Sequence, residues 1–388
     1  MPMINHVKGS GTLSLVKKIV EKQIAGKDIV RLDIGEPDFD TPISIKDAAK
    51  KALDAGDTHY FSSGSDVLKD KIIETLSREN LNYNSNEVIV TPGSKQGIFY
   101  SLFLMARGTE VIVIDPSYPA YSDVVEIVGG NSVSVNCGKD YIPDSDAISK
   151  AVTPKTSMIV INSPNNPTGL VYKKSLLEEI ADVAVEKDLY VLTDEIYKSI
   201  LFEGKHVSIA SLNGMKERCI VTCGFSKTYA MTGWRLGYVC APEELIAQMK
   251  NLQQQTAIAP TAFVQSAGIK ALDGASDKDV RKMVDEYKRR RDIFSKSMRG
   301  MGGLNYREPQ GAFYCFPDFG ELTGLRGMEL FTSILESGVS GVPGSFFGES
   351  YGSHVRFSLA QSMEKVREGA ERIREFCENL SEKHALVH

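Results

Sequence analysis

Short apolar runs recur along the middle of the chain, and a polar string bearing glycine or proline follows nearly every one. The runs cover residues 88–90, 111–114, 158–161, 189–192, 220–221 and 236–240. Continuous apolar runs of this length suit strands that are covered on both faces, as in a parallel sheet. The sequence therefore predicts an α/β fold with a mostly parallel central sheet flanked by helices.

The polar strings that follow these runs are the first indication of a functional site. They read TPGSKQG, DPSYPAY, NSPNNPTG, TDEIY and CGFSKTY in chain order. Ligands of open α/β sheets bind outside the carboxyl ends of the strands. We therefore expect the five strings to converge on one site.

Composition excludes several other classes of protein. Lys and Arg number 45 against 50 Asp and Glu, and this net charge of -5 does not favour nucleic acid or an anionic membrane as a partner. The run KRRR at 288–291 is interpreted as a solvated helix face, because acidic residues flank it on both sides. The longest apolar runs fall far short of the roughly 20 residues of a membrane span, and the start MPMINHVKGS lacks a signal-peptide apolar region. We expect a cytoplasmic protein.

Cysteine and histidine positions give no sign of a metal site or a disulfide framework. The six cysteines form no C-x-x-C pair, and the six histidines never come at the spacing of metal ligands. We therefore expect no bound metal.

The string TPGSKQG offers a cradle for a phosphate. Ser94 and Lys95 would lie at the start of a helix, where free backbone N–H groups attract an anion. The same string is also compatible with an ordinary turn and helix cap. The chain has neither G-x-G-x-x-G nor G-x-x-x-x-G-K-[ST], which argues against a dinucleotide or a P-loop nucleotide as the ligand.

Lys227 in GFSKTYAMTGWRLGY follows the predicted strand at 220–221. A lysine partly shielded from water has a lowered pKa and can form an imine with an aldehyde. A structural role would be the usual one for an isolated lysine. Here the spacing of glycines, Lys227 and Arg235, together with SPNNPTG, TDEIY and HVRFSLA in the same chain order, resembles the class I aminotransferases of fold type I. The resemblance runs from about Gly11 to the C-terminus.

The resemblance implies pyridoxal 5'-phosphate as the cofactor and assigns residues to each part of it. Lys227 resembles the imine-forming lysine, and Asp194 resembles the carboxylate that pairs with the protonated pyridine nitrogen. Tyr197 and Asn166 match the hydrogen-bond donors to the phenolate oxygen, and Tyr118 matches the ring that stacks on the cofactor. The family resemblance further implies phosphate ligands at Ser94, Lys95 and Arg235, and at Tyr60 reaching over from a neighbouring subunit of a homodimer with shared active sites.

The substrate side follows from the same resemblance. Arg356 matches the arginine that binds the substrate α-carboxylate, with Gly35 and Asn166 bordering the substrate and residues 13–16 forming part of a closing flap. Gly224 stands where many relatives have a phosphate-contacting serine, so no hydroxyl contact is expected there. Cis peptide bonds are expected before Pro116 and Pro167.

The family resemblance also implies a division into domains. Residues 1–45 would form the N-terminal segment of a small α+β domain, residues 46–290 the large cofactor-binding domain, and residues 291–388 the rest of the small domain. The small domain would thus be built from both chain ends.

The sequence is most similar to the prokaryotic aspartate aminotransferase branch. This resemblance implies ping-pong transfer of an α-amino group from an amino acid to a 2-oxo acid, with aspartate as the first choice of donor and 2-oxoglutarate as acceptor. Phe103 stands where some aspartate-specific members have a lysine, and residues 251–262 hold no arginine, so aromatic, alanine or broad-range donors stay open. A fold-type-I β-lyase or cyclase, which would share Lys227, Asp194 and Arg235, and a non-catalytic cofactor-binding regulator remain the alternatives.

Overall fold

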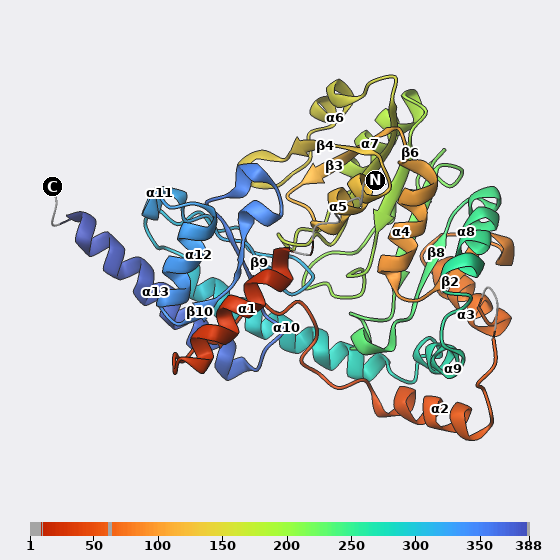
Figure 1. The fold of residues 1–388 in the computed structure, drawn as a ribbon, viewed down its shortest axis with the longest axis horizontal. Coiled ribbons are helices and arrows are strands. Elements are labelled where there is room, and N and C mark those ends of the chain that lie inside the picture. The colour runs from red at the N-terminus through yellow and green to blue at the C-terminus, as the bar shows by residue number, and fades with distance from the viewer. Residues whose placement is uncertain (1–8, 10, 61–63, 386–388) are drawn as a thin grey trace, which may run out of the picture.

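A seven-stranded sheet forms the centre of the larger part of the molecule (Figure 1). The computed structural model describes residue 9, residues 11–60 and residues 64–385. Neighbouring strands follow the order β2-β8-β7-β6-β5-β3-β4, and only β8 runs against its two neighbours. The bounds are β2 Val88–Thr91, β3 Glu110–Asp115, β4 Asn131–Asn136, β5 Thr156–Asn162, β6 Tyr190–Asp194, β7 Cys219–Gly224 and β8 Gly237–Cys240. The predicted mostly parallel sheet is confirmed.

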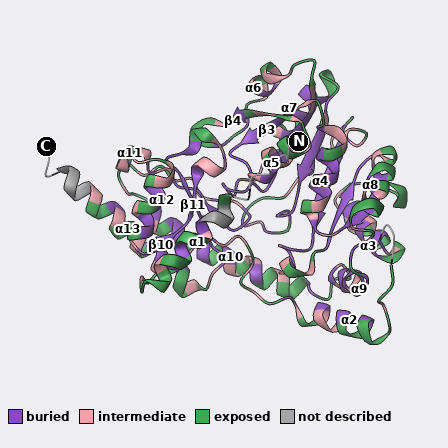
Figure 2. Cartoon of the chain, in the orientation of Figure 1, coloured by how far each residue is buried: buried purple, intermediate pink, exposed green. Residues whose placement is uncertain are grey.

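Helices cover both faces of this sheet, which explains the continuous apolar runs. Along β3, Ile112 and Ile114 face one hydrophobic core, whereas Val111 and Val113 face another on the opposite side. The central strands are accordingly buried in Figure 2. The first core packs against α2 Ile43–Asp54, α3 Asp66–Ser77, α6 Ser145–Ala151, α7 Lys174–Glu186 and α9 Ala262–Ala271, and the second against α4 Ser94–Met105, α5 Ala120–Ile127 and α8 Glu243–Thr256.

Segments from the two ends of the chain build the smaller part of the molecule. Strand β1, Val30–Arg31, pairs in parallel with β10, Val339–Ser340. Helix α1, Gly11–Ile24, packs against α12, Gly327–Glu336, and lies beside the blue segments in Figure 1. The remaining elements are β9 Tyr314–Cys315, α11 Gly320–Thr323, β11 Val342–Pro343, β12 Val355–Ser358 and α13 Met363–Ala385, of which β11, β12 and β9 form an antiparallel sheet.

Helix α10, Asp277–Met298, runs from the sheet-side helices to the smaller part (Figure 1). The proposed domain boundary between residues 290 and 291 falls inside this helix. The prediction that its basic run is a solvated face was wrong for half of the run, because Arg290 and Arg291 are buried. Arg290 pairs with Glu286, one helical turn earlier, and with Asp38, which lies far away in the sequence.

No helix within the described ranges is both long and apolar enough to cross a membrane.

Candidate active site

The polar strings converge, as expected, on one cavity of about 430 Å³. Its walls come from the segments that follow the strands, from α1, and from β12 of the smaller part. All but one of the site residues predicted from the sequence line it, namely Gly35, Ser94, Lys95, Tyr118, Asn166, Asp194, Tyr197, Lys227, Arg235 and Arg356.

At one end of the cavity, a helix start and two cations form a cradle for an anion. Helix α4 begins at Ser94, directly after Gly93, whose φ is 83°. A Cβ on Gly93 would lie 2.5 Å from Nη2 of Arg235, and a Cβ on Gly237 would lie 2.4 Å from the backbone nitrogen of Ser94. These glycines therefore let Arg235 approach the free N–H groups of the helix. Lys95 adds a second cation, which lies 5.5 Å from the ring centroid of Tyr118.

Asp194, the last residue of β6, supplies a buried carboxylate to the middle of the cavity. It accepts hydrogen bonds from the Tyr121 hydroxyl at 2.7 Å and from the Ile196 backbone N–H at 3.1 Å. Burial raises the pKa of Asp194 to about 6, although both hydrogen bonds lower it. A cationic partner in the cavity would therefore stabilise its charged form. Sequence reasoning missed Tyr121, which follows Tyr118 by three residues in the same string.

Lys227 lies beyond the end of β7 and is partly buried. Its Nζ donates a hydrogen bond of 2.6 Å to the carbonyl of Gly35. Burial lowers the pKa of Lys227 to about 8, and the charges of Arg356 and Arg235 contribute in the same direction. The amine can thus lose its proton near neutral pH, as a nucleophile or a base must.

The opposite end of the cavity is built around Arg356 in β12, which is buried. Its Nη1 donates to Oδ1 of Asn166 at 3.1 Å, and its Nη2 donates to the carbonyl of Asp33 at 3.0 Å. The guanidinium also lies 4.4 Å from the ring centroid of Tyr314. Tyr314, which sequence reasoning missed, forms a hydroxyl–hydroxyl hydrogen bond of 2.9 Å with Tyr197. The aromatic string at 312–316 was the only available signal for it.

The peptide bonds before Pro116 and Pro167 are cis, as expected, and the bond before Pro164 is cis as well. Gly224 has no room for a serine side chain without local adjustment, because a Cβ there would lie 3.0 Å from the Leu236 carbonyl.

The structure places Tyr60 apart from the other predicted residues. Tyr60 is 76% exposed and does not line the described cavity, so its contact across a subunit interface stays a prediction. Phe103 is also partly exposed outside the cavity. Leu15 and Val16 of α1 do line it, whereas the side chains of residues 13 and 14 lie outside the part that the structure describes, so the closing flap stays a prediction.

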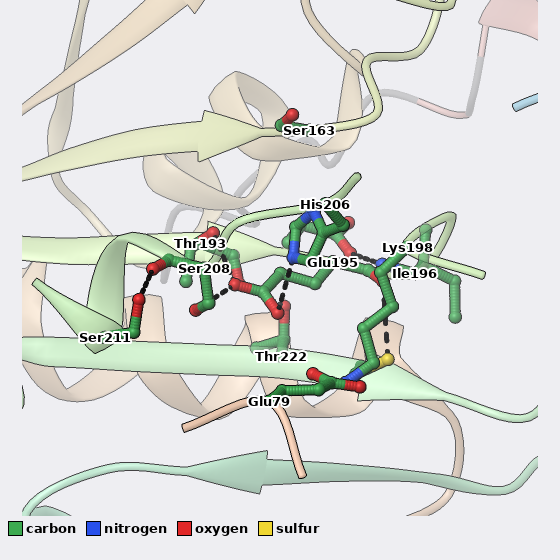
Figure 3. A network of polar contacts seen from close by, with 12 residues as sticks. Glu79, Ser163, Thr193, Glu195, Ile196, Lys198, His206, Ser208, Ser211 and Thr222 are labelled. Carbon is green, nitrogen blue, oxygen red and sulfur yellow. Dashed lines mark hydrogen bonds and ion pairs between the residues drawn. The ribbon is translucent and has the colours of Figure 1, made fainter. Parts of the chain in front are cut away.

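A buried polar network surrounds Glu195, the residue that follows Asp194 in the chain (Figure 3). Glu195 is fully buried, with Nε2 of His206 at 3.1 Å from its Oε2 and the Ser208 hydroxyl donating to its Oε1. Lys198 pairs with Glu79 at 2.7 Å in the same network. Burial acts to raise the pKa of Glu195, but the charges of His206 and Lys198 hold it below its ordinary value.

The network determines how the TDEIY segment presents its side chains. Asp194 and Tyr197 line the cavity, whereas Glu195 does not line it and is held by the Ser208 hydroxyl and the neighbouring His206. Sequence reasoning missed this network, because His206 and Glu79 are brought to Glu195 and Lys198 only by the fold.

The model of the family "Aminotransferase class I and II" matches residues 27–373. The chain belongs to this family. It is 43% identical to the aspartate aminotransferase of Pyrococcus abyssi, over 93% of this chain and 94% of that protein. It is 41% identical to aromatic-amino-acid aminotransferase 2 of Thermococcus litoralis, again over 93% of this chain and 94% of that protein.

A solved structure agrees with this family membership. The aspartate aminotransferase of Thermus thermophilus with maleate superposes with a TM-score of 0.91 and 38% identity, covering 95% of this chain and 97% of that one. The family resemblance and the fold type I architecture predicted from the motifs are therefore confirmed. As a member of the family, the protein is a transferase of the aminotransferase class, and the family implies pyridoxal phosphate as its cofactor.

Proposed function

We propose that the protein transfers the α-amino group of aspartate or an aromatic amino acid to a 2-oxo acid, with 2-oxoglutarate as the first choice of acceptor. The observation that carries this proposal is the position of Lys227. Its amine of lowered pKa lies in one cavity with the buried carboxylate of Asp194 and the buried guanidinium of Arg356.

The residues of the cavity fit pyridoxal 5'-phosphate at three points. Ser94, Lys95 and Arg235 supply a helix N-terminus and two cations for a phosphate, and the glycines beside them leave the space that it needs. Asp194 supplies an anion for a ring nitrogen, and Lys227 supplies an amine for an aldehyde. When bound, the cofactor supplies that aldehyde and an electron-poor ring that accepts electron density from the substrate α-carbon.

The protein's own groups then hold and move protons. Asp194 keeps a proton on the pyridine nitrogen, because its carboxylate would otherwise be a buried anion without a cationic partner. Nζ of Lys227 takes the proton from the substrate α-carbon and returns it at the other end of the transfer. A pKa of about 8 suits this exchange at neutral pH.

Hydrogen bonding orients the ligands around this proton exchange. Asn166 uses its Oδ1 to accept from Arg356, which leaves its Nδ2 to donate to the phenolate oxygen, with Tyr197 as the second donor. Tyr118 supplies the aromatic face that stacks on the ring. The planar fork of Arg356 binds the α-carboxylate, and the backbone at Gly35 borders the substrate.

The assembly and location of the protein also belong to this proposal. We propose a homodimer in which the exposed Tyr60 of one subunit reaches the phosphate in the other, in a protein located in the cytoplasm. The support for this dimer is that homodimers are typical of the family to which the relatives belong. A β-lyase, a cyclase or a regulator would use the same cofactor residues, but the relatives that match nearly the whole chain are named aminotransferases.

The test combines a chemical trap with product analysis. Borohydride should abolish the visible absorbance of the purified protein and leave a reduced adduct on Lys227, which peptide mass identifies. A panel of amino acids supplied with 2-oxoglutarate should yield the matching 2-oxo acids. An adduct on another lysine would refute the assignment of Lys227, and release of ammonia without consumption of an acceptor would favour the β-lyase.

A further inference from the structure

One cation of the cavity wall has no role in the proposed function. Lys95 and Arg235 face the phosphate end, Lys227 lies at the centre, and Arg356 is assigned to the α-carboxylate. Arg31 is a further cation lining the same cavity. Its side chain is 21% exposed, so it is partly accessible from the cavity.

The path of the backbone places Arg31 relative to the other groups. The carbonyl of Gly35 accepts from Lys227, and the carbonyl of Asp33 accepts from Arg356. Arg31 is two residues before Asp33, at the end of β1, and residues two apart in an extended segment point to the same side. Along this segment the contact with Lys227 is made at Gly35, the contact with Arg356 at Asp33, and Arg31 lines the same cavity two residues further from Lys227 in the chain.

Arg31 is held in place by a carboxylate but keeps donors free. Its Nε and Nη2 donate to the two oxygens of Asp33 at 2.7 and 2.8 Å, and Ser340 also donates to that carboxylate. A guanidinium has five N–H donors, and Arg31 makes no other hydrogen bond with the described residues. Its Nη1 can therefore bind a second carboxylate without releasing Asp33.

Guanidinium groups elsewhere in this chain show such sharing. Arg291 contacts Glu203 at 3.2 Å, Asp292 at 2.7 Å and Glu308 at 3.1 Å at the same time. A single guanidinium in this fold can therefore contact more than one carboxylate, as we expect for Arg31.

We propose that Arg31 binds the second carboxylate of dicarboxylic substrates, that is, acidic amino acids and the corresponding 2-oxo acids. This inference rests on the proposed function, because it takes Arg356 as the α-carboxylate site. Arg31 supplies a cation for the distal carboxylate. Phe103 is uncharged and lies outside the cavity, so it does not take this role.

The pair with Asp33 has a second consequence for specificity. When a substrate has an uncharged side chain, Arg31 stays neutralised by Asp33, and the apolar groups beside it are left for contact. Leu15, Val16, Ile34 and Val342 line this cavity as well. The site can therefore admit aromatic side chains without leaving a buried cation unpaired.

The test compares dicarboxylic with uncharged donors in the holoenzyme. Arg31→Gln should lower kcat/KM for aspartate by about 10- to 100-fold, the range for charge-assisted hydrogen bonds, and change kcat/KM for phenylalanine by less than about threefold. The Kd of maleate, measured by calorimetry, should rise by a similar factor as for aspartate. Arg31→Lys should restore part of both, because it returns the charge without the fork.

Two further variants separate recognition from folding. Arg31→Gln leaves the Asp33 carboxylate without its cation, so the double variant Arg31→Gln/Asp33→Asn removes both charges and should show the same selective loss. Arg374→Gln, which removes an exposed helix ion pair with Glu378, should change neither donor class.

Equal losses for aspartate and phenylalanine, or an unchanged Kd for maleate, would overturn the role of Arg31. A parent enzyme that transfers the amino group of phenylalanine but not of aspartate would overturn it too. Failure of the parent enzyme to transfer an amino group from any donor would instead refute the proposed function.

Discussion

Lys227 should destabilise the folded protein whenever the cofactor is removed. Burial lowers its pKa from 10.5 to about 8, which corresponds to about 3 kcal/mol of unfavourable free energy in the folded state. Because the side chain is only partly buried, we take about 2 kcal/mol of that value. Replacing Lys227 by methionine, which has similar length and no charge, should recover this free energy.

The dependence on pH follows from the two pKa values. Below pH 8 the amine carries its proton in both the folded and the unfolded chain, so the full cost applies. Between pH 8 and 10.5 the folded protein loses the proton while the unfolded chain keeps it, so stability rises with pH. Above 10.5 both forms are neutral and the cost is gone.

Urea unfolding of the cofactor-free protein measures this effect. At pH 7, Lys227→Met should be more stable than the parent by about 2 kcal/mol, and the difference should shrink towards zero near pH 10.5. Lys51→Met on the exposed face of α2 is the matched control and should stay within about 0.5 kcal/mol of the parent at every pH. A variant that is no more stable than the parent at pH 7, or a gain that is the same at all pH values, would refute the reasoning.

Two other substitutions test the substrate end and the buried network. Arg356→Ala should lower kcat/KM for all amino and 2-oxo acids together, by an amount equivalent to roughly 2 to 5 kcal/mol, and Arg356→Lys should recover part of it. A loss confined to dicarboxylic substrates would place Arg356 at the side-chain end of the cavity. His206→Ala removes the imidazole that lies 3.1 Å from the fully buried Glu195 carboxylate and should cost about 1 to 3 kcal/mol in urea unfolding, and a cost below about 0.5 kcal/mol would show that this contact contributes little to stability.

The sequence predicted the central sheet and most of the cavity for a physical reason. Strands buried on both faces are continuously apolar, so their carboxyl ends, and the residues that follow them such as Asp194 and Lys227, could be located along the chain. The family resemblance then assigned Arg356, which lies in another part of the chain. These residues do line one cavity.

What the sequence could not provide was the pairing of distant charges. Arg290 and Arg291 looked like a solvated run because their partners Asp38 and Glu203 lie far away in the chain. Arg31 and Asp33, separated by one residue near the N-terminus, gave no sign that they line the same cavity as Arg356. Periodicity and motifs report local structure, whereas the neutralisation of a charge depends on what the fold brings next to it.

The pairing of β1 with β10 also has a consequence for synthesis of the chain. Val30 pairs with Val339, so β1 cannot pair until about 300 further residues have been synthesised. This takes roughly 15 to 60 s at ordinary rates of translation. The seven-stranded sheet is complete earlier, once β8 has emerged to pair with Val88. A nascent chain can therefore bring Arg235 to the start of α4 while its first strand is still unpaired and Arg356 has not yet been made. Val30 and Leu32, both fully buried in the finished protein, are exposed to chaperones during that interval.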